Sequence, residues 1–185
     1  MSAGFFRSEE FQSRGYFIYR FYSILGRIPV STEFYPDAAK VSGFLTPEQL
    51  EANKSAFVTE FMARAEFQNK YSSKFNDPAA YVDGLLQTVG LTGHPSRAQW
   101  ITMLNNSNTA QNRGIVLRQL VDSTEFYNKY NNEAFVIMQY FGYLRRTADA
   151  SYQNWIQTMN STGGDYRTMI NGFLNSAEYR RRFGP

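Results

Sequence analysis

The fold class is decided by residues 166–183, which read YRTMINGFLNSAEYRRRF. Apolar side chains recur there at i, i+3, i+4, i+7 and i+8, a spacing that places them on one face of an α-helix. They are Tyr166, Met169, Ile170, Phe173 and Leu174. Asp165 follows Gly163-Gly164 and is predicted to cap this helix.

The same stretch ends in a motif that occurs four times: a small or polar residue, then Glu, then an aromatic residue. The copies are Ser8-Glu9-Glu10-Phe11, Arg64-Ala65-Glu66-Phe67, Ser123-Thr124-Glu125-Phe126 and Ser176-Ala177-Glu178-Tyr179. The glutamates at positions 10, 66, 125 and 178 are 56, 59 and 53 residues apart. Serine is a favourable N-cap, and Glu in the first turn complements the positive end of a helix. Each copy is therefore predicted to be a short helix that closes one internal repeat.

We predict an all-α fold in which three degenerate helical repeats of about 55 residues pack as one compact helical array. The expected boundaries are 16–71, 72–130 and 131–185, with residues 1–15 forming the end of a preceding repeat. Because the chain starts with a closing motif, we expect it to be the C-terminal part of a longer protein. No segment shows the sustained alternation of a strand.

Within the repeats, several helix starts and turns can be read from the residues. Thr46-Pro47-Glu48-Gln49 has the form of a capping box, Asn76 or Asp77 precedes Pro78, and Thr109 or Asn112 starts a later helix. Each first helix is followed by a turn and then by a large aromatic residue. The turns are Gly26-Arg27, Gly90 and Arg145-Arg146, and the aromatic residues are Phe34, Trp100 and Trp155.

Composition excludes several classes of site. The 185 residues contain no cysteine and one histidine, which excludes thiolate chemistry and disfavours a Ser-His-Asp hydrolase. No Walker-type loop, dinucleotide fingerprint or nucleophile elbow is present. No run approaches the roughly 18 apolar residues of a membrane span, and the N-terminal residues do not form a signal peptide. We therefore expect a non-enzymatic chain with no cofactor, no metal site and no transmembrane segment.

The charge balance allows two interpretations. Nineteen basic and sixteen acidic residues give a net charge of +3, and Arg145-Arg146 and residues 180–182 contribute to the excess. These arginines would form either an anion-binding patch or a solvated helix end that complements the helix dipole. The second interpretation is favoured because basic and acidic residues are otherwise interspersed, and no nucleic-acid partner is expected.

Aromatic residues make up 17% of the chain, and they too have two interpretations. Most lie at core spacing, while a minority would be exposed platforms for stacking on sugars. The candidate binding residues are Trp155, Tyr152, Trp100 and Asp149. Asp149 is interpreted as a cap for the helix that carries Trp155 in preference to a metal ligand. Tyr19, Tyr127 and Tyr143 are further candidates for exposure, and His94 is expected in an exposed loop, with no catalytic role.

The third repeat resembles a bacterial helical domain of unknown function. The resemblance rests on residues 135–144, on Arg146, Asp149 and Trp155 in the turn and the segment after it, and on a C-terminal set. That set is Ile170, Phe173, Leu174, Asn175, Ser176, Glu178, Tyr179 and Phe183. The turn has the form Leu-Gly-Arg-x-x-Asp in that family, whereas Val30 and His94 stand at the Asp position in the first two repeats.

The resemblance implies a context but no activity. That family occurs in repeated copies in large secreted or surface proteins, together with hemolysin-type calcium-binding repeats or Calx-beta domains, and it is distantly similar to phycobilisome linker domains. We therefore expect a non-catalytic interaction or scaffolding module, extracellular or at the cell surface, with a protein or a cell-envelope glycan as partner. The alternative is a carbohydrate-binding module that uses exposed Tyr and Trp.

Overall fold

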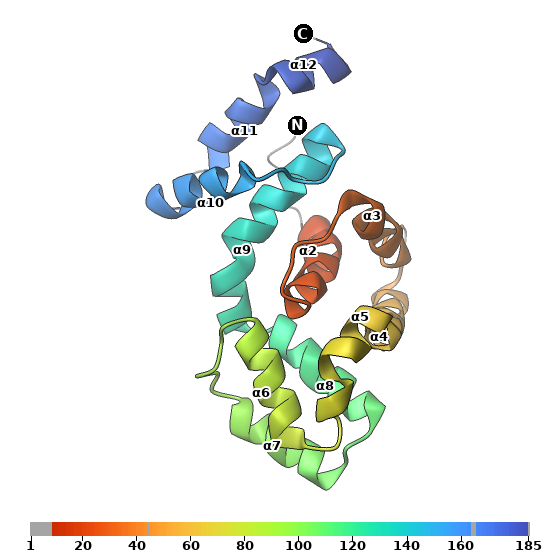
Figure 1. Ribbon diagram of the computed structural model, residues 1–185. Helices are drawn as coiled ribbons and strands as arrows, with labels where there is room; N and C mark the ends of the chain where they lie inside the picture. The colour runs from red at the N-terminus through yellow and green to blue at the C-terminus, as the bar shows by residue number, and fades with distance from the viewer. Residues whose placement is uncertain (1–8, 44, 164–165, 185) are drawn as a thin grey trace.

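The computed structural model describes residues 9–43, 45–163 and 166–184, and within these ranges every regular element is helical (Figure 1). The prediction of an all-α fold is confirmed. The helices are α2 (Glu9–Ile24), α3 (Ser31–Lys40), α4 (Pro47–Ala63), α5 (Ala65–Tyr71), α6 (Pro78–Thr88), α7 (Arg97–Asn106), α8 (Ala110–Val121), α9 (Thr124–Gln139), α10 (Tyr152–Ser161), α11 (Tyr166–Leu174) and α12 (Ala177–Phe183). A 3-10 turn, η1 (Ser72–Lys74), and a π turn, η2 (Tyr140–Leu144), complete the order.

Most predicted helix starts are confirmed. Thr46 and Gln49 form the capping box before α4, Asp77 accepts two N–H groups at the start of α6, and Thr109 caps α8. Ser123 and Ser176 accept the N–H groups of the aromatic residues three positions later, as the closing motif predicts. The first copy of the motif and the predicted cap Asp165 lie outside the described side chains.

Helix α2 lies in the middle of the molecule and packs against α3, α6, α8 and α9 (Figure 1). Phe17 and Phe21 on α2 are fully buried and meet Phe57 and Phe61 of α4. The ring centroids of Phe21 lie 5.2 Å from Phe57 and 5.4 Å from Phe61, in edge-to-face geometry. Such pairs add to the stabilisation from apolar burial. The interpretation of most aromatic residues as core is therefore correct, and Tyr19 and Tyr143 also belong to this core.

Helix α9 differs from the predicted boundary at residue 130. It starts with the closing motif at Ser123 and continues without a break into η2, so one helix crosses from the second predicted repeat into the third. Buried residues on its second half, such as Val136 and Ile137, follow the polar residues 131–133, but no glycine or proline precedes them that would end the helix. Helices α10, α11 and α12 pack on α9, on η2 and on one another and extend away from the rest (Figure 1).

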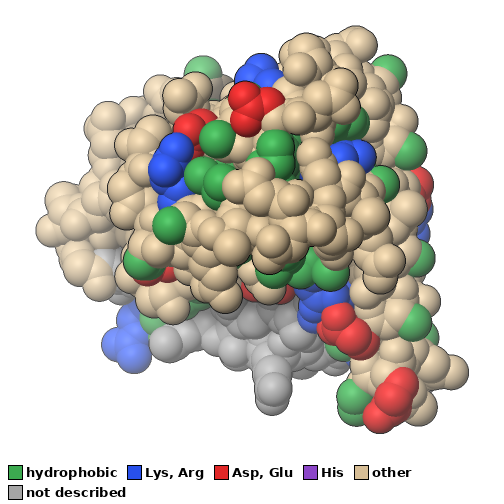
Figure 2. Space-filling view, turned by 90° about the horizontal axis from the view of Figure 1, so that it is seen from below, with side chains coloured by type: hydrophobic (Ala, Val, Ile, Leu, Met, Phe, Trp, Pro, Cys, Tyr) green, Lys and Arg blue, Asp and Glu red, His purple; other side chains and the backbone are tan. Residues whose placement is uncertain are grey.

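The surface is mixed in character. On the face seen from below, hydrophobic side chains gather near the centre, and charged side chains lie mostly toward the edges (Figure 2). Among the described helices, none combines the length and the apolar character needed to cross a bilayer.

Candidate functional site

The four predicted binding residues do not share one surface. Trp100 on α7 is 2% exposed, its ring stacks on His94 at 4.5 Å, and its Nε1–H donates to Gln119 at 2.7 Å. The tryptophan therefore belongs to the core and offers no stacking platform. Helix α7 also lies at the opposite end of the molecule from α10, which carries Tyr152 and Trp155 (Figure 1).

Tyr152 and Trp155 are both half-buried on α10, three residues apart, and face different neighbours. The Trp155 ring lies 5.7 Å from Phe173 and directly against Gly172 of α11, where a larger residue would collide with it. Tyr152 lines a polar hollow formed with α2 and α9. The structure thus assigns Trp155 to the packing of α10 on α11 and places Tyr152 at an accessible site.

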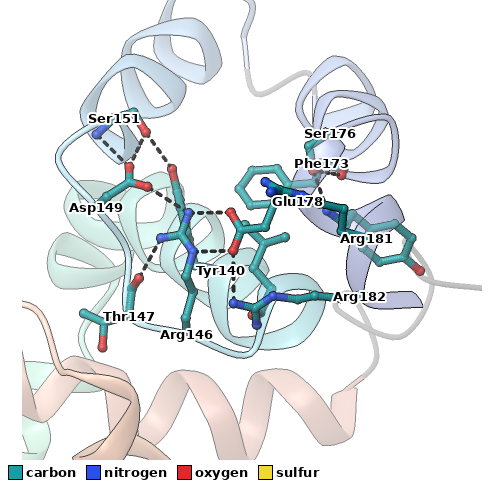
Figure 3. Close-up of polar contacts among 12 residues, drawn as sticks. Tyr140, Arg146, Thr147, Asp149, Ser151, Phe173, Ser176, Glu178, Arg181 and Arg182 are labelled. Atoms are coloured by element: carbon teal, nitrogen blue, oxygen red, sulfur yellow. Dashed lines mark hydrogen bonds and ion pairs between the residues drawn. The ribbon is translucent and has the colours of Figure 1, made fainter. Parts of the chain in front are cut away.

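Asp149 takes part in an ionic network centred on Arg146 (Figure 3). The Arg146 guanidinium donates to both oxygens of Glu178, at 2.8 and 2.9 Å, and to Asp149 Oδ2 at 2.8 Å. Asp149 Oδ1 accepts the Ser151 N–H at 3.0 Å, so the carboxylate orders the entry into α10, close to its predicted capping role. The network therefore joins the turn after η2 to α12.

The electrostatics of this network fix its charges. Hydrogen bonds from Ser151 and Arg146 hold the pKa of Asp149 below its ordinary value, and Arg146 does the same for Glu178. The two carboxylates in turn raise the pKa of Arg146. Near neutral pH all three groups stay charged, so the arrangement holds helices together and does not exchange protons.

A bidentate pair of the same kind occurs at the second closing motif, and a looser contact occurs at the third. Arg27, in the turn after α2, donates to both oxygens of Glu66 at 2.8 and 2.7 Å. His94, in the loop after α6, has its Nε2 3.3 Å from Glu125 Oε2. Each of the three described glutamates, Glu66, Glu125 and Glu178, thus lies beside an arginine or a histidine from the turn that follows the preceding long helix. We call this pairing, together with the contacts described next, the turn clamp.

A second contact of the turn clamp is made one helical turn later. Four residues after each of the last three glutamates, a basic side chain donates to a carbonyl at the end of the preceding long helix. Lys70 donates to Leu25 O at 3.1 Å, Lys129 to Gly90 O at 2.8 Å, and Arg182 to Leu144 O. A basic group at a helix C-terminus satisfies free carbonyls and complements the helix dipole.

The helix ends that receive these contacts also share a backbone conformation. Gly26, Gly90 and Arg145 have φ angles of +82°, +60° and +47°, which is the left-handed conformation typical of helix C-termini. Glycine adopts it without steric cost, whereas Arg145 does so with a Cβ. These recurring turns precede each turn-clamp contact in the chain.

The expectation that His94 is exposed is wrong. It is 6% exposed, not solvent-exposed, because its ring stacks on Trp100 and its Nδ1 accepts the Ser96 N–H at 3.1 Å. Burial lowers its pKa, although the nearby Glu125 carboxylate opposes this effect. The neutral ring closes the turn before α7 and acts as a structural residue.

Sequence reasoning missed a buried ionic cluster around Asp37 of α3. This aspartate is 4% exposed and accepts hydrogen bonds from Tyr22 at 2.7 Å, from two Arg64 nitrogens at 2.7 Å each, and from Lys40 at 3.0 Å. The signal available in the sequence was Arg64, which replaces the N-cap serine of the closing motif. The cluster ties α3 to α2 and α4, and among the described residues no group of three metal-ligating side chains is found there or elsewhere.

A hollow of about 760 Å³ lies between α4 and α8. Val58 and Met62 of α4 and Ile115 of α8 give it an apolar floor, and Ile115 is 39% exposed. Gly114 permits the close approach of the two helices, since a Cβ there would lie 3.3 Å from both Val58 and Met62. An apolar floor of this size is typical of a binding groove.

The comparison with protein families matches residues 117–183 to the family described as Domain of unknown function (DUF4214). The match runs from the last turns of α8 through α12 and includes the Arg146 network. It supports the resemblance to a domain of unknown function over this part of the chain. No curated protein and no solved structure matches the chain.

Proposed function

We propose that the chain is built from three repeats of about 55 residues, each closed by one turn clamp. The support is that Glu66 and Glu178 each accept two hydrogen bonds from an arginine in the turn that follows the preceding long helix, and that Glu125 lies 3.3 Å from His94 of the corresponding loop. In this proposal α9 contains both the closing helix of repeat two and the first helix of repeat three. Stacked repeats of this kind present extended surfaces to partners.

We further propose a non-catalytic interaction module that binds a helical segment of a protein partner. The observation that carries the proposal is the groove between α4 and α8, because two packed helices with an apolar floor between them complement the apolar face of a third helix. Polar residues on the rim, such as the ion pair of Arg118 with Glu51, would fix the orientation of the partner. The resemblance described above supports a place at the surface of a bacterium or in a secreted protein.

Site-specific photocrosslinking tests this proposal. A photoreactive residue at Gln111, on the exposed rim of the groove, is introduced into the chain in the cells that naturally produce it. We expect one discrete protein adduct, and we expect Ile115→Glu in the same chain to abolish it, because a charge would then occupy the groove floor. A photoreactive residue at Val30 is the control, since its exposure of 38% matches that of Ile115.

Two outcomes would contradict the groove proposal. One is an adduct at Gln111 that persists in the Ile115→Glu chain, and the other is the same adduct at Val30. Circular dichroism of the Ile115→Glu chain shows whether the fold is retained. We expect it to be retained, because Ile115 is an exposed position on α8.

A second candidate function is carbohydrate binding, and one observation favours it. Tyr152, alone among the predicted aromatic binding residues, lines an accessible polar hollow. Trp155 and Trp100 give no support, because their rings pack against α11 and in the core.

A further inference from the structure

A small polar hollow lies where α2, α6, α9 and α10 meet. It has a volume of about 210 Å³, and six of the side chains around it are polar. They are Ser23, Arg27, Thr88, Tyr130, Glu133 and Tyr152. The volume is below the roughly 300–1,000 Å³ of sites for drug-sized ligands, so the hollow suits one small ring.

Three of these groups are already used by the fold. The Arg27 guanidinium donates hydrogen bonds to Glu33, to Glu66 and to the Ile28 carbonyl. Thr88 donates to Gly84 O and lies 2.9 Å from the Tyr71 hydroxyl, and Tyr130 donates to Val89 O at 3.1 Å. These residues therefore form the walls, and Arg27 is neutralised by two carboxylates.

Three other groups have capacity left for a ligand. Ser23 is 5% exposed, yet its hydroxyl has no hydrogen-bond partner among the described residues, and the same holds for the Tyr152 hydroxyl. Glu133 accepts one hydrogen bond, from Tyr19 at 2.6 Å, and has no ion-pair partner in the described part of the chain. The Ser23 and Tyr152 residues line the hollow, so a water molecule or a ligand there can supply the hydrogen bonds that the protein does not.

The chemistry of the free groups favours a neutral ligand with several hydroxyls. The Glu133 carboxylate accepts hydrogen bonds and repels anions, while Ser23 and Tyr152 both donate and accept. An aromatic cage for an organic cation is disfavoured, because one face of Tyr130 stacks on Phe126 at 4.5 Å and the Lys129 ammonium lies 5.8 Å from the same ring.

We propose that this hollow binds a single neutral pyranose unit. Glu133 accepts from two ring hydroxyls, Ser23 and Tyr152 complete the hydrogen bonds, and the Tyr152 ring covers one edge of the sugar. The site lies apart from the groove between α4 and α8 and does not depend on it. It gives the carbohydrate candidate a defined location that differs from an exposed stacking surface.

Titration of the full chain with glucose, galactose, mannose and N-acetylglucosamine, followed by amide NMR shifts, tests the site. We expect at least one sugar to shift the amides of Ser23, Gly26 and Tyr152. Glu133→Gln keeps an acceptor for Tyr19 and should fold, but it should weaken binding about tenfold or more, since charge-assisted hydrogen bonds are lost. Glu48→Gln, on the exposed first turn of α4, is the matched control and should bind like the native chain.

Any of three results would overturn the proposal. These are the absence of shifts at the hollow with all four sugars, binding that Glu133→Gln leaves unchanged, and equal shifts with methylammonium in place of a sugar. The photocrosslinking at Gln111 reports on the groove alone, so failure of the sugar site leaves that test unaffected, and the reverse also holds.

Discussion

Residues of the same type have different roles in this protein, because the neighbours of each side chain differ. Trp100 and Trp155 occupy corresponding places in the predicted repeats, yet Trp100 is buried against His94 and Trp155 is half-buried against Gly172. The sequence shows that each repeat has an aromatic residue at this place. It does not show how exposed the side chain is, because exposure depends on the helix that packs against it. Arg27 shows the same limit, since its turn could be read from the sequence while its partner Glu66 lies 39 residues away.

The buried histidine makes stability depend on pH. Burial lowers the pKa of His94 below its ordinary value of about 6.5, so the unfolded chain binds a proton more readily than the folded chain. Acidification below about pH 6.5 should therefore destabilise the native chain relative to His94→Gln, which does not titrate. Urea unfolding of both chains between about pH 7 and pH 5 measures this difference. A native chain that gains relative stability on acidification would show that attraction to Glu125 dominates instead.

A buried tyrosine hydroxyl binds the same helix end as one turn clamp. Tyr71 is 1% exposed and donates to Ile24 O at 2.6 Å, with Thr88 Oγ1 2.9 Å away. Tyr71→Phe should lower the free energy of unfolding by about 1–2 kcal/mol, because a buried carbonyl loses its donor. Tyr127→Phe, at a residue that is 46% exposed, is the control and should change it by less than about 0.5 kcal/mol. Equal effects in denaturant unfolding would exclude the role assigned to Tyr71.

At the level of helices, starts were easier to predict than ends and junctions. Thr46 and Asp77 were read correctly because a cap needs only residues within one turn. The fusion of the closing motif with the following helix in α9 was missed. A glycine or a proline marks the end of a helix, but no residue type marks its continuation. The π turn η2 was also missed, since it depends on how its residues pack against α12.

The left-handed helix ends allow a test within one loop. Gly90 has a φ of +60°, and an added Cβ would also displace Lys129, whereas a Cβ at Gly93 meets nothing within 4 Å. Gly90→Ala should therefore destabilise the chain by about 1–2 kcal/mol. Gly93→Ala should be close to neutral, because it brings neither strain nor collision. Thermal unfolding of the two variants measures both effects, and a Gly90→Ala chain as stable as Gly93→Ala would show that this helix end tolerates a side chain.

At the scale of the whole molecule, the all-α class could be predicted because it follows from helical spacing along the chain. The groove between α4 and α8 and the hollow near Glu133 could not, because each joins helices from distant parts of the sequence. The net charge is unevenly distributed along the chain. Residues 1–139 hold 13 basic and 13 acidic residues, so the net charge of +3 resides in residues 140–185. There Arg146 and Arg182 pair with Glu178, which accords with the interpretation of these arginines as a helix end.

The central claim is that one turn clamp recurs along the chain, and double-mutant cycles on Arg27–Glu66 and Arg146–Glu178 test it most directly. Each pair is bidentate and partly exposed, so we predict coupling free energies of about 0.5–1 kcal/mol in both. The crossed pairs Arg27–Glu178 and Arg146–Glu66 serve as controls and should be additive, because their members share no contact. Coupling in the two clamp pairs no larger than in the crossed pairs would contradict the claim.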